Sequence, residues 1–290
     1  MVLVKRIIKK ILVFLGFFKS KNIWPILSDK KKHFLIKNVY IKSSVETINK
    51  IKNTIRKKQK GAYMRFGDGD VYLMLGLNDM LHKGNKKMAK EMKEAIKLNI
   101  GILHKGLAIH SKLFGYEPGM ENGIHLISNK DALKYLSVSH KYLNIKKLVT
   151  PVALHQLARF HENGCISFLR FLNSTNPIFV GNQNIKSEII KKLFGNIHIK
   201  TPLRDSYNEI DRIENELIQI LENNRKEFRV VVVAMGCPGR ILQKRILKKG
   251  YQVYLFDFGS LLDAFNGDET RAWISLTGGV DIYTALLNKL

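Results

Sequence analysis

The stretch Arg229–Met235 restricts the fold more than any other part of the sequence. It reads Arg-Val-Val-Val-Val-Ala-Met, with four consecutive valines and no alternation of apolar and polar residues. A strand with one face in water alternates, whereas a central parallel strand is covered on both faces and is apolar throughout. The sequence therefore predicts a buried parallel strand here, and with it an α/β fold.

The residues after this strand complete a strand–helix–strand unit. The turn Gly236–Gly239 is followed by a predicted helix up to Lys249 and by a second predicted strand, Gln252–Phe256. Further strands are predicted at 62–66, 106–110, 177–181 and 197–200. Helical patterns alternate with these strands, so we predict a Rossmann-like, mainly parallel sheet flanked by helices. A single catalytic domain over residues 41–290 follows a separate N-terminal segment, residues 1–40.

The first candidate site is Arg65–Asp70, at the end of the predicted strand 62–66. Ligands of open parallel sheets bind at the carboxyl ends of the strands. Asp68 and Asp70 place two carboxylates close together on a tight turn, and a divalent cation relieves the repulsion between them. We therefore expect these two aspartates to be metal ligands.

The other residues of this segment suit a diphosphate. Gly67 and Gly69 let the backbone approach a ligand closely, and Arg65 supplies a charge-assisted contact to phosphate. The alternative is structural, because an aspartate in such a turn also caps the helix that follows.

The second candidate is the turn after the valine strand. Gly236 and Gly239 open a helix whose backbone N–H groups point at a phosphate, and Pro238 near its start removes no needed donor. A plain strand-to-helix turn is the alternative. Cys237 is a poor nucleophile candidate, because no histidine lies near it in the sequence.

The third candidate follows the strand Gln252–Phe256. Asp257 and Asp263 are candidates for the catalytic base, a ribose contact or a further metal contact, and Ser260 for a nucleotide contact. Residues 268–273 are predicted to form a loop over this edge of the sheet.

The charge of the chain is concentrated at its N-terminus. The formal net charge is +25, and residues 1–60 hold 17 Lys and Arg against two acids, an excess of 15. Residues 1–21 alternate basic side chains with an apolar set at helical spacing: Val4, Ile7, Ile8, Ile11, Leu12, Leu15 and Phe18. Such a helix binds an acidic membrane surface, although an ordinary helix packed on the domain is the alternative. Its longest apolar run, Ile11–Phe18, is shorter than the roughly 20 residues of a membrane span.

The cysteine content indicates a cellular compartment. Cys165 and Cys237 are too few for a disulfide framework. A reducing cytoplasm fits this composition, and together with the basic helix it predicts a peripheral position at the inner face of the cell membrane.

The string Arg-Phe-Gly-Asp-Gly-Asp at Arg65–Asp70 resembles the hallmark of the type-D glycosyltransferase fold (GT-D) family. This bacterial group was formerly known only as a domain of unknown function. Its usual pattern ends in Glu, so Asp70 keeps an oxygen ligand on a side chain one methylene shorter. The stretch Val230–Ser260 also resembles that family's carboxyl-terminal half, and the similarity spans roughly residues 45 to 275.

The resemblance implies an activity and its partners. It implies a nucleoside-diphosphate sugar as donor and a divalent metal, Mn²⁺ or else Mg²⁺, with Asp68 and Asp70 matching the metal-binding acids. The acceptor would be a glycan, a lipid-linked glycan or a glycoprotein of the bacterial surface. The residues alone leave open another metal-dependent nucleotide-diphosphate enzyme, a phosphotransferase or hydrolase. A nucleic-acid-binding protein is disfavoured, because the positive charge lies in one amphipathic segment and acids gather at the strand ends.

Overall fold

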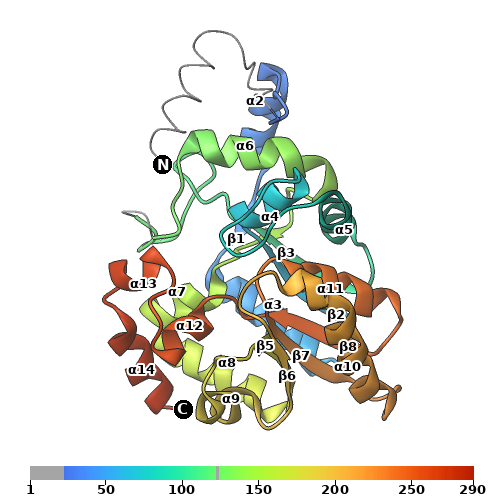
Figure 1. Ribbon diagram of the computed structural model, residues 1–290. Coiled ribbons are helices and arrows are strands. Elements are labelled where there is room, and N and C mark those ends of the chain that lie inside the picture. Colours follow the sequence, from blue (N-terminus) through green and yellow to red (C-terminus); the bar gives the residue numbers. More distant parts are fainter. Residues whose placement is uncertain (1–22, 122–123) are drawn as a thin grey trace, which may run out of the picture.

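The computed structural model describes residues 23–121 and 124–290 (Figure 1). The predicted amphipathic helix over residues 1–21 lies outside this part of the chain. Within it, eight parallel strands form one sheet. In sheet order they are β1 Ile41–Lys42, β4 Leu148–Val149, β3 Ile102–Leu107, β2 Gly61–Phe66, β8 Val253–Asp257, β7 Arg229–Ala234, β5 Ile178–Asn182 and β6 His198–Thr201.

The valine strand is β7, and it is buried as predicted. Val231 and Val233 belong to the hydrophobic core on one face of the sheet, and Val230 and Val232 to the core on the other. Both faces are covered, so every position of the strand interior is apolar. The α/β fold class is confirmed.

Two helical layers cover the sheet (Figure 1). One layer packs on the core that holds Val231; it consists of α2 Asp29–Asn38, α4 Asp68–Met74, α5 Lys86–Lys97, α6 Asn129–Ser139, α10 Ile210–Glu222 and α11 Pro238–Lys248. The other consists of α3 Ser44–Arg56, α7 Ala153–Phe160, α8 Glu162–Ser174, α9 Ser187–Phe194, α12 Leu261–Asn266, α13 Ala272–Leu276 and α14 Val280–Asn288. The 3₁₀ turns η1 His140–Tyr142 and η2 Ser206–Glu209 connect elements at the edges.

Three local predictions differ from the structure. The strand expected at 106–110 lies at Ile102–Leu107. Helix α8 was not anticipated, although its buried residues Cys165, Phe168, Leu169 and Leu172 have helical spacing. The loop expected over 268–273 gives way to helix α13 from Ala272, which buries Trp273 and Ile274 against the core.

The chain changes direction in the sheet between β2 and β8. From β2 it proceeds outward through β3 and β4, then crosses to β5 and β6 and returns through β7 to β8, which pairs with β2. Such a switch point opens a crevice at the carboxyl ends of the two strands, which is where ligands of open α/β sheets bind.

Residues 23–40 pack on the rest of the domain. Trp24 contacts the rings of Tyr72 and Tyr135, and Leu27 and Leu35 are buried in the core. Among the described residues, no helix combines the length and the apolar character that crossing a membrane requires.

Candidate functional site

A cavity of about 560 Å³ lies at the switch point, at the carboxyl ends of β2, β8 and β7. All three segments singled out in the sequence contribute to its wall. Of the predicted site residues, it is lined by Arg65, Gly67, Asp68, Gly69, Asp70, Gly236, Asp257, Ser260 and Asp263. The ends of neighbouring parallel strands meet at one edge of a sheet, so segments distant in the sequence form one site.

Arg65 ends β2 and points across the switch point toward β8. Its Nη1 donates to the carbonyl of Phe258 over 2.9 Å and lies 3.9 Å from Asp257 Oδ1. Gly259 has a positive φ of 72°, and a Cβ there would lie 1.5 Å from Arg65 Nη1. Only glycine therefore leaves room for this guanidinium.

Arg240, in the first turn of α11, joins the ends of the three strands. Its Nη1 lies 2.9 Å from Asp257 Oδ2, its Nε lies 3.3 Å from Asp70 Oδ1, and its Nε also donates to the carbonyl of Arg65. Arg240 was not among the site residues predicted from the sequence. Its position in the helix turn that follows β7 is the signal that would have found it.

Asp68 and Asp70 occupy the first turn of α4, where a tight turn with two adjacent carboxylates was expected. Residues two apart in a helix do not lie on one face, so Asp68 is exposed while Asp70 is buried, yet both line the cavity. Asp70 Oδ2 accepts the backbone N–H of Gly67 over 2.7 Å, which is the capping role considered as the alternative.

The second oxygen of Asp70 is left for another partner. Oδ1 is buried and accepts no well-directed hydrogen bond from the described residues, although Arg240 lies nearby. Burial raises the pKa of Asp70 to about 6, against the opposing effects of Arg240 and the Gly67 N–H. Burial of this carboxylate in its charged form is therefore unfavourable, and a bound cation would offset that unfavourable free energy.

Two glycines predicted to approach phosphate make room instead for a neighbouring loop. A Cβ on Gly69 would lie 3.1 Å from both Asp79 Oδ2 and Cys237 Sγ, and one on Gly236 would lie 2.9 Å from His82 Cε1. Gly239 does not line the cavity; its Cβ would lie 2.9 Å from Val233 Cγ1, so it serves close packing of α11 on β7.

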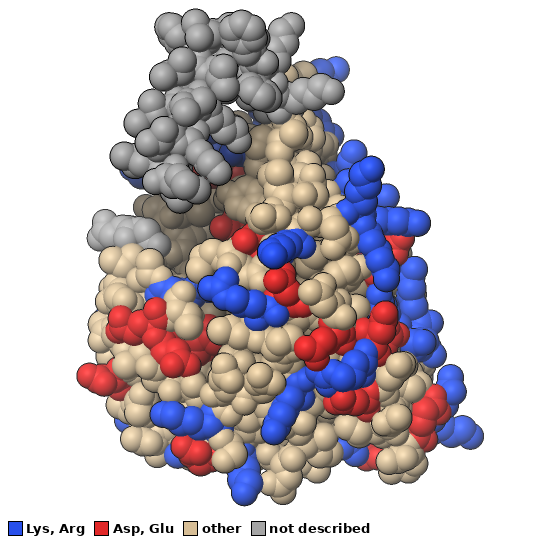
Figure 2. Space-filling view, in the orientation of Figure 1, with Lys and Arg blue, Asp and Glu red and all other residues tan. Residues whose placement is uncertain are grey.

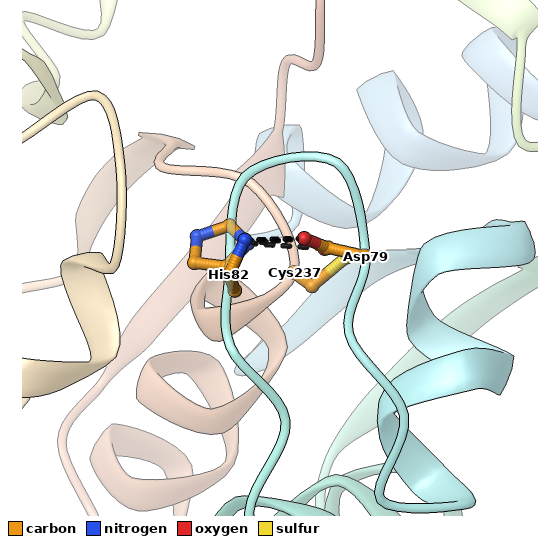
Figure 3. A group of neighbouring side chains, drawn as sticks. All are labelled: Asp79, His82 and Cys237. Atoms are coloured by element: carbon orange, nitrogen blue, oxygen red, sulfur yellow. Dashed lines mark hydrogen bonds and ion pairs between the residues drawn. The ribbon is translucent and has the colours of Figure 1, made fainter. Parts of the chain in front are cut away.

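The loop between α4 and α5 brings two further residues to the cavity (Figure 3). His82 Nδ1 lies 3.0 Å from Asp79 Oδ2, and both side chains face Cys237. Hydrogen bonds from His82 and Cys237 lower the pKa of Asp79 to about 2, although burial alone would raise it. This group was not predicted from the sequence, where the Asp-x-x-His spacing just after α4 is its local signal.

Asp257 and Asp263, the two candidate bases, lie in different surroundings. Asp257 is buried between the guanidinium groups of Arg65 and Arg240. Asp263 accepts a 2.5 Å hydrogen bond from Thr270, and burial raises its pKa. The oxygens of Asp257 thus face two arginines, whereas Asp263 is bonded to a neutral hydroxyl and lines the cavity.

Ser260 connects the cavity to an aromatic cluster. Its Oγ accepts from Trp273 Nε1 over 3.2 Å and lies 3.4 Å from His155 Nε2. The rings of His125, His155 and Trp273 pack against one another. Burial lowers the pKa of both histidines, so neither ring carries a positive charge at neutral pH.

The cavity lining is more acidic than the protein around it. Three arginines and five aspartates line it, so negative charges outnumber positive charges by two in a chain of net charge +25. Figure 2 shows many of the Lys and Arg side chains along the right-hand flank, over α5. An anionic ligand would enter this lining favourably only together with a cation.

Comparisons with solved structures identify the same architecture elsewhere. The chain is similar to a structure described as a new glycosyltransferase (DUF1792) from Streptococcus sanguinis, with 17% identity and a TM-score of 0.57 over 76% of this chain and 81% of the other. A selenomethionine-substituted structure of domain of unknown function 1792 has 19% identity and a TM-score of 0.55, over 79% of this chain and 82% of that one.

A third structure extends the comparison. It is described as showing that the highly conserved domain of unknown function 1792 has a distinct glycosyltransferase fold; it has 19% identity and a TM-score of 0.53 over 77% of this chain and 79% of that one. No protein-family model and no curated protein matches the sequence. At these identities the likeness establishes the fold, which is the one that the Arg65–Asp70 string led us to expect.

Proposed function

We propose that this protein is a metal-dependent glycosyltransferase that moves a sugar from a nucleoside-diphosphate sugar to a glycan, lipid-linked glycan or glycoprotein acceptor. The observation that carries the proposal is the acidic, arginine-containing cavity at the β2–β8 switch point. A fold shared with structures described as glycosyltransferases supports it, as does the Arg65–Asp70 string.

The arginines of the cavity suit a diphosphate. The Nε of Arg65 is buried without a hydrogen-bond partner. Arg271 lines the cavity, and its hydrogen bonds to the described residues are long, at 3.4 Å to the carbonyl of Thr270 and 3.6 Å to Met80 Sδ. Both guanidinium groups can therefore bind phosphate oxygens as the leaving group gains negative charge.

A divalent metal fits the acids at the start of α4. Asp70 Oδ1 is a buried oxygen without a hydrogen bond, and Asp68 has no hydrogen bond or ion pair among the described residues. Oxygen donors of this kind suit Mn²⁺ or Mg²⁺. A metal held by Asp68 and Asp70 would act as a Lewis acid toward the diphosphate.

Transfer breaks the bond between the sugar C1 and the β-phosphate oxygen and forms a bond from C1 to the acceptor oxygen. The acceptor hydroxyl proton must pass to a base. Asp263 is our candidate because it faces the cavity and is bonded to Thr270. Asp257 instead holds Arg65 and Arg240 in place.

The proposal is tested by incubating the full chain and Mn²⁺ with a panel of nucleotide sugars and measuring release of nucleoside diphosphate. We expect release from one class of donor, and its loss on removal of metal by a chelator. Asp68→Asn should reduce release by more than about 100-fold, as expected for lost charge stabilisation. Asp131→Asn, in the first turn of α6 and away from the cavity, is the matched control.

Two results would count against the proposal. Absence of binding or release with every donor would refute it. Release to water that stays unchanged when glycan acceptors are added would instead identify a metal-dependent nucleotide-diphosphate hydrolase.

We also propose that the protein binds the inner face of the cell membrane through residues 1–21. The adjoining described segment supports this, because Ile26, Phe34 and Ile36 are exposed beside Lys30 and Lys31. In sedimentation with phosphatidylserine vesicles, the full chain should pellet with the vesicles. A chain without residues 1–21 should stay in the supernatant. Equal partitioning of the two would refute this attachment.

A further inference from the structure

The loop between α4 and α5 and the turn after β7 bring Asp79, His82 and Cys237 together at the wall of the cavity (Figure 3). We infer that these three side chains form a second metal site, selective for a thiophilic cation of the Zn²⁺ class. This site is distinct from the oxygen-only pair Asp68 and Asp70, and its existence does not depend on the proposed activity.

The first observation is the donor set. One carboxylate oxygen, one imidazole nitrogen and one sulfur all lie within 4.8 Å of one another. Zn²⁺ binds all three donor types, usually in tetrahedral geometry, and a thiolate favours it over Mn²⁺ or Mg²⁺. Three protein ligands leave a fourth position for water or for an oxygen of a molecule in the cavity.

The second observation is the hydrogen-bond order around His82. Ser206 Oγ lies 3.1 Å from the carbonyl of Met235 and must donate its only hydrogen there, since a carbonyl accepts only. Ser206 Oγ therefore accepts from His82 Nε2, 3.3 Å away, and fixes the hydrogen on that nitrogen. The other ring nitrogen, Nδ1, then directs a lone pair at the Asp79 carboxylate.

That contact needs a positive charge between its two atoms. Nδ1 lies 3.0 and 3.1 Å from the two oxygens of Asp79, and two acceptors at this distance repel each other. Either a second ring proton or a metal ion removes the repulsion. Without a metal, a second ring proton on His82 and the S–H of Cys237 would both be shared with Asp79. A metal ion would replace these two hydrogens and bind all three donors, which already lie within 4.8 Å of one another.

The third observation is that the surroundings hold the three ligands in place. Asp79 Oδ1 accepts the backbone N–H groups of Leu81 and His82 at 2.7 and 2.5 Å. The loop between α4 and α5 is also hydrogen-bonded to the segment after β6, because Asp205 Oδ1 accepts the Lys83 N–H over 2.8 Å. Partners that orient the ligands in this way accompany metal sites in proteins.

The fourth observation is the space reserved for the cluster. Gly69 in α4 and Gly236 after β7 both face it, and a Cβ on either would lie within 3.1 Å of a ligand side chain. Two different elements thus lack a side chain where the cluster sits. Glycine inside a helix is otherwise unfavourable by roughly 1 kcal/mol relative to alanine.

The test uses Co²⁺ as a spectroscopic substitute for Zn²⁺, added to the reduced full chain without nucleotide sugar. We expect one equivalent to produce a sulfur-to-cobalt charge-transfer band, and stoichiometric Zn²⁺ to abolish it. Cys237→Ser should remove the band and weaken Co²⁺ binding by more than about 10-fold. Cys165→Ser, at a buried cysteine of the opposite core, is the matched control and should keep the band.

A second variant tests the site in case Cys237→Ser does not fold. Ser206→Ala removes only the partner of Nε2, so the band should persist while Co²⁺ affinity falls about 10-fold, as for other lost supporting partners. Absence of a charge-transfer band in the folded wild-type chain would overturn the inference. Persistence of the band in Cys237→Ser would overturn it as well.

Discussion

Helix α11 carries two buried ion-pair clusters that differ in how completely their acids are satisfied. Near the middle of the helix, Lys244 and Arg245 face acids of α5 and α10. At its start, Arg240 faces Asp70 and Asp257. Both clusters pair basic side chains of α11 with acidic side chains of other elements, but the hydrogen bonds around the acids differ.

The inner cluster, Lys244 and Arg245 with their partners, is fully bonded. Arg245 donates to Glu91, Asp211 and Glu214, while Lys244 and Tyr207 also donate to Glu91. These bonds lower the pKa of Glu91 to about 2, although burial alone would raise it. Both oxygens of Glu91 are thus hydrogen-bonded, so this cluster serves the packing of three helices.

The cavity cluster, Arg240 with Asp70 and Asp257, is incompletely bonded. Oδ1 of Asp70 and Oδ2 of Asp257 accept no well-directed hydrogen bond, although Arg240 lies within ion-pair distance of both. The pKa of Asp70 is raised rather than lowered. Incomplete bonding of buried charge marks a binding site more reliably than the presence of charge does.

The largest stability effect should come from the inner cluster. Arg245→Met leaves Glu91 and Glu214 with fewer partners, and we expect the free energy of unfolding to fall by about 3 kcal/mol, the lower end of the cost of breaking a buried ion pair. Urea denaturation measures this loss. Nucleotide-sugar affinity of the folded variant should not change, and a change would mean that the two clusters are coupled.

The same substitution in the cavity cluster should give the reverse result. Arg240→Met should weaken nucleotide-sugar binding by more than about 10-fold while reducing the free energy of unfolding less than Arg245→Met does. Asp70 can take up a proton when its partner is lost, and Arg65 remains beside Asp257. Calorimetric titration and urea denaturation on both variants compare the clusters directly, and equal stability losses would contradict the distinction.

Gly259→Ala tests the position of Arg65 in the cavity. The left-handed backbone alone costs a residue with a Cβ about 1–2 kcal/mol, and here the Cβ would also displace the guanidinium. Gly250→Ala is the matched control, because Gly250 has a φ of 88° and no atom within 4 Å of its Cβ position. Both variants should be destabilised in thermal unfolding, and only Gly259→Ala should also lose donor binding.

The pH dependence of stability should separate the acids of the two clusters. The folded pKa of Asp70 is about 6, above the ordinary 3.8, so the folded state binds its proton more tightly than the unfolded state. Stability should therefore fall as pH rises from about 4 to about 6, by on the order of 3 kcal/mol. Asp70→Asn should abolish this fall in urea denaturation without metal, and an unchanged pH profile would contradict the raised pKa.

Glu91 should show the opposite slope. Its folded pKa of about 2 lies below the ordinary 4.5, so stability is lost as pH falls from about 4.5 toward 2. Glu91→Gln should flatten this acid limb and leave the profile between pH 4 and 6 intact. If Glu91→Gln also flattened the stability profile between pH 4 and 6, the fall in that range would belong to Glu91 and not to Asp70.

The smallest effect on stability is expected at Asp68. This exposed carboxylate lies in the first turn of α4 and makes no hydrogen bond or ion pair with the described residues. Asp68→Asn should change the free energy of unfolding by less than about 0.5 kcal/mol. Loss of Mn²⁺ binding without loss of stability would mark Asp68 as a ligand rather than a structural residue.

The sequence by itself determined the layers of the fold and the segments of the site. Four valines in a row require cover on both faces of a strand, and that cover requires helices. Arg65, Asp70 and Asp257 were identified because each lies at or next to the end of a predicted strand. Parallel strands bring such ends to one edge whatever their order.

Only the tertiary structure decided which of these side chains meet. The order of strands places β8 between β2 and β7, and this sets Asp257 between Arg65 and Arg240. It also carries the loop after α4 over Cys237, so that Asp79 and His82 join a cysteine more than 150 residues away. Strand order and loop position depend on packing across the whole sheet, and no local pattern of residues encodes them.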